Sequence, residues 1–228
     1  MRTMNSVRSL RFVCSAMGAV SLLAACAGSP PVNYYTLQEA AGSAVDASTP
    51  LRLTGDRTVI EVLPVSVPAQ VDQPQIMLRD AAGAMSPRYS ERWAAPLGDE
   101  VRSALSNRLT RRLDVADVYE VKPARGQPVW RVQVDVQRFD SILGEAAIID
   151  ATWRLRPVNM QAPAILCRTS VRQAVTGSDV GAVVTAHQRA LRTLGDSVAA
   201  RLAGTDSRLP EGVAQQCSAV SEPATPPK

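Results

Sequence analysis

Apolar residues occupy every second position along three neighbouring stretches in the second half of the chain, which are 130–136, 147–155 and 165–171. Most of the positions between them carry arginine, aspartate, glutamine, serine or threonine. This period of two is typical of a β-strand with one buried face. Short segments with polar residues or glycine link the three stretches, so the pattern predicts an antiparallel meander.

Further strands are predicted in the first half of the chain. The run 58–67 is so apolar that it indicates a central, well-buried strand, which ends at Pro68. The segment 38–57 is small and polar and predicts a loop. Shorter strands are predicted at 34–37, 75–79 and 115–121, with an extended piece at 88–90.

Two helices are predicted from apolar residues that recur every three or four positions. The first follows Trp93 and has Pro96 in its opening turn, with two acidic residues near its positive end and an apolar stripe from Leu97 to Leu113. The second runs from a good N-cap, Asp179, to Leu202 and stops before Gly204.

Two helices are too few to cover both faces of a sheet with about six strands. The sequence therefore predicts an α+β fold with two layers, in which a mixed, largely antiparallel sheet carries both helices on one face. The other face of the sheet is polar and is left to solvent or to a partner. Its arginines fit a solvated face and a docking surface equally well: Arg131, Arg154, Arg168 and Arg172.

The amino-terminal segment has the pattern of a lipoprotein signal peptide. A start with three arginines is followed by an uncharged apolar run, 12–25, which ends at Ala24-Ala25-Cys26. This run suits a secretory signal, because a membrane-spanning helix needs about 20 apolar residues. Small residues before a cysteine predict cleavage between Ala25 and Cys26 and acylation of Cys26, which would anchor the protein to a membrane. The alternative is an ordinary signal peptide followed by a chance cysteine. Ala27, which is not an aspartate, favours the outer membrane under the sorting rule of enterobacterial lipoproteins.

The chain is predicted to divide into four parts: a signal peptide at 1–25, a tether at 26–33, a single domain at 34–204 and a flexible tail at 205–228. The formal net charge of the whole chain is +4, from 25 basic and 21 acidic residues. Removal of the three signal-peptide arginines leaves 22 basic residues against 21 acidic ones, a net charge of +1. Nucleic acid is not an expected partner, because phosphate binding needs a strong basic excess.

Two of the four cysteines remain once Cys14 is cleaved off and Cys26 is acylated. They are Cys167 and Cys217. In an oxidising compartment, two thiols favour a disulfide, which here would tie a late strand to the tail. The alternative is two free cysteines, with Cys167 packed in the core.

Catalytic and metal-binding patterns are nearly absent from the sequence. The single histidine, His187, lies on or beside the apolar stripe of the second helix, and no nucleophile motif accompanies it, so a structural role is expected. Ligand pairs such as Cys-x-x-Cys and glycine-rich phosphate loops do not occur, so neither a metal nor a cofactor is expected. The sequence therefore predicts a non-catalytic protein.

Three motifs carry a resemblance to a known family. They are Tyr-Tyr-Thr-Leu at 34–37, Val-Leu-Pro-Val at 62–65 followed by Asp-Gln-Pro-Gln-Ile at 72–76, and Arg-Trp-Ala-Ala-Pro-Leu at 92–97. By these motifs the chain resembles the PqiC (YmbA-like) family of ABC-type transport auxiliary lipoproteins over nearly the whole mature domain. Gln70, Val71 and Gln73 depart from the family pattern, which has an aromatic residue, a leucine and an arginine there.

The resemblance implies an outer-membrane lipoprotein that faces the periplasm and works with a periplasmic MCE-domain protein and an inner-membrane permease or ATPase. Such systems move phospholipids or related hydrophobic molecules between the two membranes, and a ring of identical subunits is one possible arrangement. The loop with Asp72, Pro74 and Gln75 is a second docking candidate, since loops on a rigid scaffold commonly carry recognition. Two other functions stay open: a lipid carrier with an apolar cavity, and an envelope enzyme that uses His187.

Overall fold

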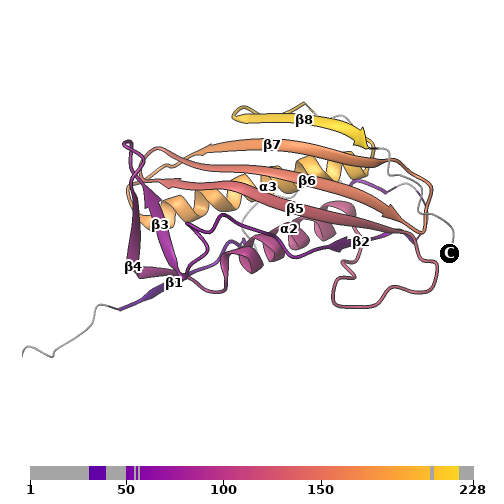
Figure 1. The fold of residues 1–228 in the computed structure, drawn as a ribbon, viewed down its shortest axis with the longest axis horizontal. Helices are drawn as coiled ribbons and strands as arrows, with labels where there is room; N and C mark the ends of the chain where they lie inside the picture. Colours follow the sequence, from indigo (N-terminus) through magenta and orange to yellow (C-terminus); the bar gives the residue numbers. More distant parts are fainter. Residues whose placement is uncertain (1–30, 40–49, 54, 56, 206–207, 221–228) are drawn as a thin grey trace, which may run out of the picture. The chain divides into compact units, whose positions relative to one another are not determined.

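The computed structural model describes residues 31–39, 50–53, 55, 57–205 and 208–220 of the chain. Within this part, the chain has the α+β fold that the sequence predicts, with two helices packed against mixed sheets (Figure 1). The predicted signal peptide, its cleavage site at Ala25, the lipidated Cys26 and most of the tether lie outside the described residues.

The larger sheet has five strands in the order β2-β5-β6-β7-β8. Strands β5 (Val129–Ile142), β6 (Ala146–Val158) and β7 (Ala164–Ala174) pair antiparallel and form the predicted meander. Strand β2 (Val59–Val62) runs parallel to β5 at one edge, and β8 (Val213–Val220) runs antiparallel to β7 at the other.

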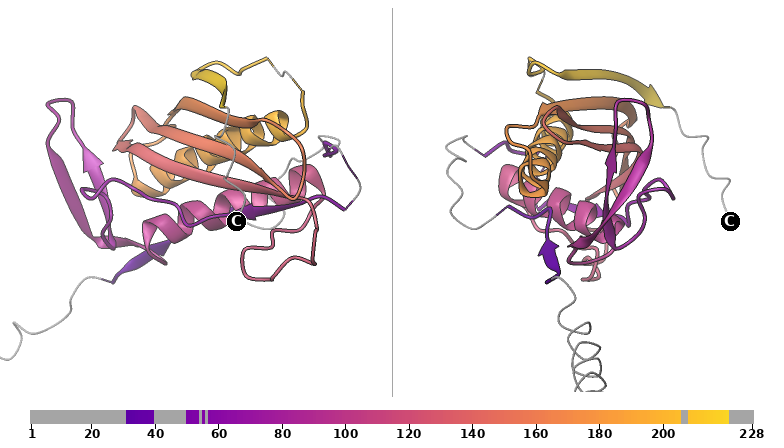
Figure 2. Two further views of the ribbon diagram at one scale, coloured as in Figure 1. Left: turned by 45° about the vertical axis from the view of Figure 1, so that its right-hand side comes forward. Right: turned by 90° about the vertical axis from the view of Figure 1, so that its left-hand side faces the viewer.

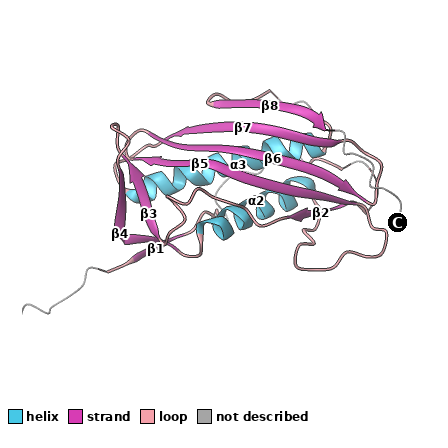
Figure 3. Ribbon diagram, in the orientation of Figure 1, coloured by secondary structure: helices cyan, strands magenta, loops and turns pink. Residues whose placement is uncertain are grey.

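Both helices lie on the same face of this sheet (Figures 2 and 3). Helix α2 (Leu97–Leu113) buries the predicted leucine and valine stripe. Helix α3 (Val180–Leu202) begins at the predicted cap, where the carboxylate of Asp179 accepts a hydrogen bond from the backbone N–H of Ala182 at 2.7 Å. The alternating apolar residues of the meander fill the space between the sheet and the helices: Val132, Val134, Val136, Ile149, Trp153, Leu155 and Val171.

The two helices approach each other closely at Gly195. A Cβ atom added at this position would lie 2.7 Å from Cγ of Arg108 on α2. Arg108 is buried, and its guanidinium donates to both carboxylate oxygens of Asp196 at 2.9 and 2.8 Å. Glycine leaves room for the stem of this arginine, so a missing side chain on α3 sets the spacing between the helices.

A second, smaller sheet stands at one end of β5, where the sequence had predicted a single sheet. Its order is β1-β4-β3, with β1 (Asn33–Tyr35) parallel to β4 (Met85–Trp93) and β3 (Gln75–Arg79) antiparallel to β4. The two sheets are joined by an ion pair of 2.8 Å between Arg79 and Asp140, the latter being buried. Apolar periodicity shows which face of a strand is buried but not which strands pair, and this explains the difference.

The prediction that 58–67 forms a central strand is wrong in position. Strand β2 lies at the sheet edge, and its burial comes from other parts of the chain. The segment 116–118 covers the free edge of β2, because the N–H of Ile60 donates to the Ala116 carbonyl at 3.1 Å and the carbonyl of Ile60 accepts from the Val118 N–H at 2.8 Å. An edge covered in this way has the same apolar signature as a central strand.

The strand predicted at 115–121 does not form. Only a single bridge links Asp117 to Ile60 in the described residues of this segment. The side chain of Asp117 accepts hydrogen bonds from the backbone N–H groups of Val62 and Tyr119 at 3.1 and 3.0 Å, and from Arg102 at 3.1 Å. These bonds hold the segment in a loop conformation in place of a regular ladder.

The flexible tail predicted at 205–228 contains a strand. Strand β8 pairs with β7 along its whole length, and a disulfide joins Cys167 to Cys217 across the two strands, with the Cα atoms 4.1 Å apart. Cys167 is 1% exposed and belongs to the core. The domain therefore extends at least to Val220, and residues 221–228 lie outside the described part.

Candidate docking site

The three sequence motifs meet at one place in the structure. Trp93 and Tyr35 are neighbours in the ladder between β4 and β1. The backbone N–H of Trp93 donates to the Pro74 carbonyl at 2.9 Å, and the N–H of Ala94 donates to the Tyr35 carbonyl at 2.8 Å. Motifs that lie tens of residues apart in the chain are thus hydrogen-bonded through their backbones where the smaller sheet meets the start of α2.

A hollow opens at this junction, with a volume of about 380 Å³. We name it the motif pocket, and it is lined by Asp72, Gln73, Pro74, Trp93, Ala94, Ala95, Pro96 and Leu97. Its wall is mainly apolar, with Asp72 as its one ionisable residue. The indole of Trp93 is 5% exposed and contacts Phe139 edge to face, with ring centroids 6.1 Å apart. A rigid aromatic wall beside small side chains can receive an apolar side chain of a partner.

The loop that carries Asp72 is held by its own backbone. The N–H groups of Val71 and Asp72 both donate to the Pro68 carbonyl, at 3.0 and 3.1 Å. Val71 is 4% exposed and packs in the core, so it anchors the loop with an apolar side chain. Gln73 donates to the Gln70 carbonyl at 3.3 Å, so this side chain contacts its own loop.

The predicted docking residues of this loop are partly brought together. Asp72 and Pro74 line the motif pocket, whereas Gln75 begins β3, where it pairs with Arg92, and is not among the lining residues. The sequence reading missed Trp93, Ala95 and Pro96 as lining residues. The motif at 92–97 could have indicated these lining residues. Its pattern was instead interpreted as the start of a helix, and α2 does begin at its last residue, Leu97.

The four predicted arginines lie on the face of the larger sheet that points away from the helices, and we call this surface the arginine face. Their registers show it, because Trp153 points into the core and Arg154 is the next residue of β6. Arg131 pairs with Arg156, and Arg168 pairs with Thr152, both on the same side as Arg154. The sequence reading did not include Arg156 among the site residues, although its period of two assigns it to this face.

Acidic residues offset part of the charge of this face. Arg131 donates to Glu61 on β2 at 2.6 Å, and Arg172 donates to Glu145 at 2.8 Å. Both pairs are partly open to solvent, so each contributes little stability. Arg168 is exposed, and Arg154 is half-buried. The arginine face is therefore a mixed charged surface with a modest basic excess, which suits orientation of a partner more than tight binding.

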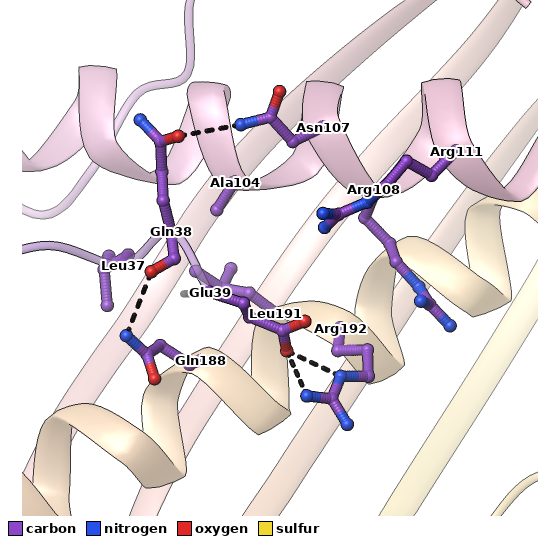
Figure 4. Close-up of a pocket in the computed structure, with 10 residues that line it drawn as sticks. All are labelled: Leu37, Gln38, Glu39, Ala104, Asn107, Arg108, Arg111, Gln188, Leu191 and Arg192. Atoms are coloured by element: carbon purple, nitrogen blue, oxygen red, sulfur yellow. Dashed lines mark hydrogen bonds and ion pairs between the residues drawn. The ribbon is translucent and has the colours of Figure 1, made fainter. Parts of the chain in front are cut away.

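A second hollow lies between α2 and α3, where residues 36–39, which we call the entry segment, pass over both helices (Figure 4). Gln38 accepts a hydrogen bond from Asn107 on α2 at 2.9 Å, and Gln188 on α3 donates to the Thr36 carbonyl at 2.9 Å. Arg192 donates to the carboxylate of Glu39 at 2.6 Å. The entry segment is thus hydrogen-bonded to both helices.

Glu100 binds the entry segment to α2. This residue of the first turn of α2 is 5% exposed and accepts hydrogen bonds from the hydroxyl of Thr36 at 2.7 Å and from the N–H of Leu37 at 2.8 Å. Nearby, a hydrogen bond to Glu91 raises the pKa of Tyr35 to about 12. Chain segments close to the predicted tether are therefore fixed to the domain by acidic side chains, of which Glu100 is buried.

His187 lies beside a serine hydroxyl, as the general base of a hydrolase would, but a substrate cannot reach it. Its Nε2 lies 2.8 Å from the hydroxyl of Ser141, while its Nδ1 has no hydrogen-bond partner. The ring stacks on Phe139 with centroids 3.9 Å apart, and desolvation lowers its pKa to about 3. His187 is 0% exposed and Ser141 is 1% exposed, so a substrate does not reach this pair. The geometry assigns His187 a packing role.

In the described part of the chain, no group of three or more histidine, cysteine or acidic side chains is arranged to hold a metal ion. None of the helices described has the length and apolar character needed to span a membrane.

Comparisons with known proteins address the family and the fold. A family model described as "ABC-type transport auxiliary lipoprotein component" matches residues 35–199. None of the curated proteins matches the chain. A crystal structure described as an uncharacterized protein is similar with a TM-score of 0.59 and 17% identity, over 76% of this chain and 99% of that one, which supports the fold alone. A Xanthomonas campestris protein of family DUF330 is 21% identical over 68% of this chain and 96% of its own, with a TM-score of 0.49.

Proposed function

Because this chain belongs to the family of ABC-type transport auxiliary lipoprotein components, we propose that it is a non-catalytic, lipid-anchored subunit of a transport system in the cell envelope. In this proposal, cleavage after Ala25 exposes Cys26, and the acylated Cys26 holds the domain on the outer membrane, facing the periplasm. More than one acyl chain gives stable anchoring, whereas a single chain binds only marginally.

The proposed partner is a periplasmic MCE-domain protein that works with an ABC-type permease, and the proposed cargo is phospholipid or a related hydrophobic molecule. The resemblance to the PqiC (YmbA-like) branch of the family supports this assignment. A subunit without chemistry of its own contributes by presenting a docking surface at a constant place. Tethering raises the effective concentration of that surface for its partner.

The convergence of the motifs on the motif pocket is the observation that carries this proposal. A fold by itself does not require an Asp-x-Pro-Gln-Ile loop to lie against an Arg-Trp-Ala-Ala-Pro-Leu turn. Here the two are hydrogen-bonded and together line one mainly apolar hollow. Hollows of this kind receive the buried anchor residues that dominate binding energy in protein interfaces. The arginine face is the second proposed contact and would act mainly on association rate and orientation.

The test is to fill the motif pocket without disturbing the fold. Ala95 is exposed and lines the pocket, so Ala95→Arg places a long charged side chain in it. Ala124→Arg makes the same change at an exposed loop position elsewhere and serves as the matched control. Each acylated full-length variant is isolated from detergent-solubilised membranes, and the recovered MCE-domain protein is quantified.

We expect wild type and Ala124→Arg to recover the MCE-domain protein equally and Ala95→Arg to recover at least tenfold less, a loss of about 1.4 kcal/mol or more in binding free energy. Equal recovery by all three proteins would exclude the motif pocket as the docking site. Consistent absence of any MCE-domain protein from the wild-type sample would count against the transport assignment itself.

A further inference from the structure

Two neighbouring strands at the end of the domain where the chain enters it carry exposed aromatic side chains. Tyr34 on β1 is 65% exposed and Tyr89 on β4 is 72% exposed, while Val32, just before β1, is 40% exposed. The two strands are neighbours in the smaller sheet. Large apolar side chains with this degree of exposure usually indicate an interaction surface when they lie close together.

Two arginines accompany these side chains. Arg92 is the ladder partner of Tyr34, and its Nε donates to the Tyr89 carbonyl at 3.4 Å. Arg88 is exposed on the same strand as Tyr89. The acidic residue between them, Glu91, accepts a hydrogen bond from Asn33 at 3.1 Å and from Tyr35. We call Val32, Tyr34, Arg88, Tyr89 and Arg92 the tyrosine patch.

This combination matches the boundary between water and lipid tails. Tyrosine has an apolar ring and a polar hydroxyl, and it is enriched where one end of a side chain is in hydrocarbon and the other in water. Arginine extends an apolar stem along such a boundary and directs its guanidinium to phosphate oxygens.

The length of the chain between the acylation site and the patch keeps the two close. Five residues separate Cys26 from Val32, so the six Cα-to-Cα steps of a fully extended backbone span at most about 22 Å. Strand β1 then pairs with β4, and the entry segment is bound to Glu100, so this distance cannot grow by release of the following residues without loss of buried hydrogen bonds. Val32, the first residue of the tyrosine patch, is therefore held within about 22 Å of Cys26.

We propose that the tyrosine patch rests on the headgroup region of the bilayer that holds the acyl chains. This inference depends on the lipid anchor of the proposed function. Tyr34 and Tyr89 insert their rings at the interface, and Arg88 and Arg92 contact lipid phosphates. A bilayer is favoured over a protein as the occupant, because the anchor supplies lipid at this patch at high effective concentration without any further recognition. The contact orients the domain and adds no affinity for the transport partner.

The test uses tryptophan as a depth reporter in the acylated full-length protein. The three native tryptophans are buried, with at most 9% exposure, so they contribute a constant background. The reporters are Tyr34→Trp and Tyr89→Trp. The matched control is Val121→Trp, because Val121 is 66% exposed and lies outside the smaller sheet. Each protein is reconstituted into phosphatidylethanolamine and phosphatidylglycerol vesicles with or without lipid brominated on its acyl chains.

We expect brominated lipid to reduce the added fluorescence of Tyr34→Trp and Tyr89→Trp at least twofold and to leave Val121→Trp unchanged. Aqueous iodide should quench the fluorescence of Val121→Trp more strongly than that of Tyr34→Trp and Tyr89→Trp. Equal quenching of all three variants by brominated lipid would overturn the proposal. Equal quenching of Tyr34→Trp and Tyr89→Trp by iodide in vesicles and in detergent would overturn it as well. Flotation with the vesicles reports the anchor separately. Proteins that float without lipid quenching retain the anchor and disprove the membrane contact, and proteins that do not float disprove both.

Discussion

The backbone N–H of Leu37 donates a hydrogen bond of 2.8 Å to the buried carboxylate of Glu100, which stands 63 positions later in the chain. Leu37 is 1% exposed, so this bond is closed to water. It connects the residues that follow the predicted tether directly to the first turn of α2. The entry segment is therefore attached to the helix layer by a buried hydrogen bond.

Replacement of this carboxylate is expected to weaken the attachment of the entry segment. In Glu100→Leu, the N–H of Leu37 and the hydroxyl of Thr36 lose their shared acceptor, and an unsatisfied buried donor costs about 1–3 kcal/mol. Urea unfolding followed by circular dichroism measures the free energy of unfolding. The control is Asp99→Asn, an exposed acid in the same helical turn, which should change stability by less than about 1 kcal/mol. Equal losses in both variants would contradict a specific role for the bond.

The close helix contact at Gly195 gives a second prediction. A methyl group in Gly195→Ala would lie 2.7 Å from Cγ of Arg108, a distance at which the atoms must move apart. We expect a loss of about 1–3 kcal/mol in the free energy of unfolding, because over-packing in a tight core is destabilising. Thr185→Ala, at an exposed position of the same helix, should stay within about 0.5 kcal/mol of wild type. A stabilised Gly195→Ala variant would show that the helices can separate without cost.

The disulfide should contribute measurably to stability. It closes a loop of 50 residues, and chain-entropy arguments give about 2–4 kcal/mol for a bond of this kind. Reduction with dithiothreitol should lower the urea midpoint of wild type. The double variant Cys167→Ala and Cys217→Ala should start from that lower midpoint and show no response to dithiothreitol. Identical midpoints for oxidised and reduced wild type would be inconsistent with a stabilising link between β7 and β8.

The buried histidine predicts a pH dependence of stability. Desolvation lowers the pKa of His187 in the folded protein to about 3, whereas an unfolded chain has a histidine pKa near 6.5. Because the folded pKa is the lower one, the stability contributed by the neutral ring is present above pH 6.5 and is lost as the pH falls toward 3. From pH 6.5 to 5 this amounts to about 2 kcal/mol.

The variant His187→Gln removes this titrating group. It should be less stable than wild type at pH 7, since it loses the stacking on Phe139, but it should lose less stability between pH 7 and pH 5. Urea unfolding at the two pH values measures both quantities, and comparison with wild type cancels the carboxylates that titrate in the same range. Parallel losses in the two proteins would show that His187 becomes protonated without unfolding.

The helices and the meander were predictable because their signals are local. Asp179 caps α3, and the alternation of valines with polar residues in β5 shows its buried face, since burial imposes a period on consecutive positions. The disulfide between Cys167 and Cys217 could be proposed by elimination, but the sequence did not show that it joins two neighbouring strands. Strand β8 was missed because a half-exposed edge strand, with few large apolar residues, has the same composition as a tail.

The amino-acid sequence by itself determined the two amphipathic helices, the three-strand meander, the arginine face and the motifs that identify the family, because each depends on residues that are near neighbours in the chain. Tertiary structure alone decided that β1, β3 and β4 form a separate sheet, that β2 is an edge strand, and that Pro74 and Trp93 meet at one hollow. The reason is that strand pairing and long-range backbone hydrogen bonds depend on which distant segments together bury the most apolar surface, and that choice leaves no period in any single stretch of residues.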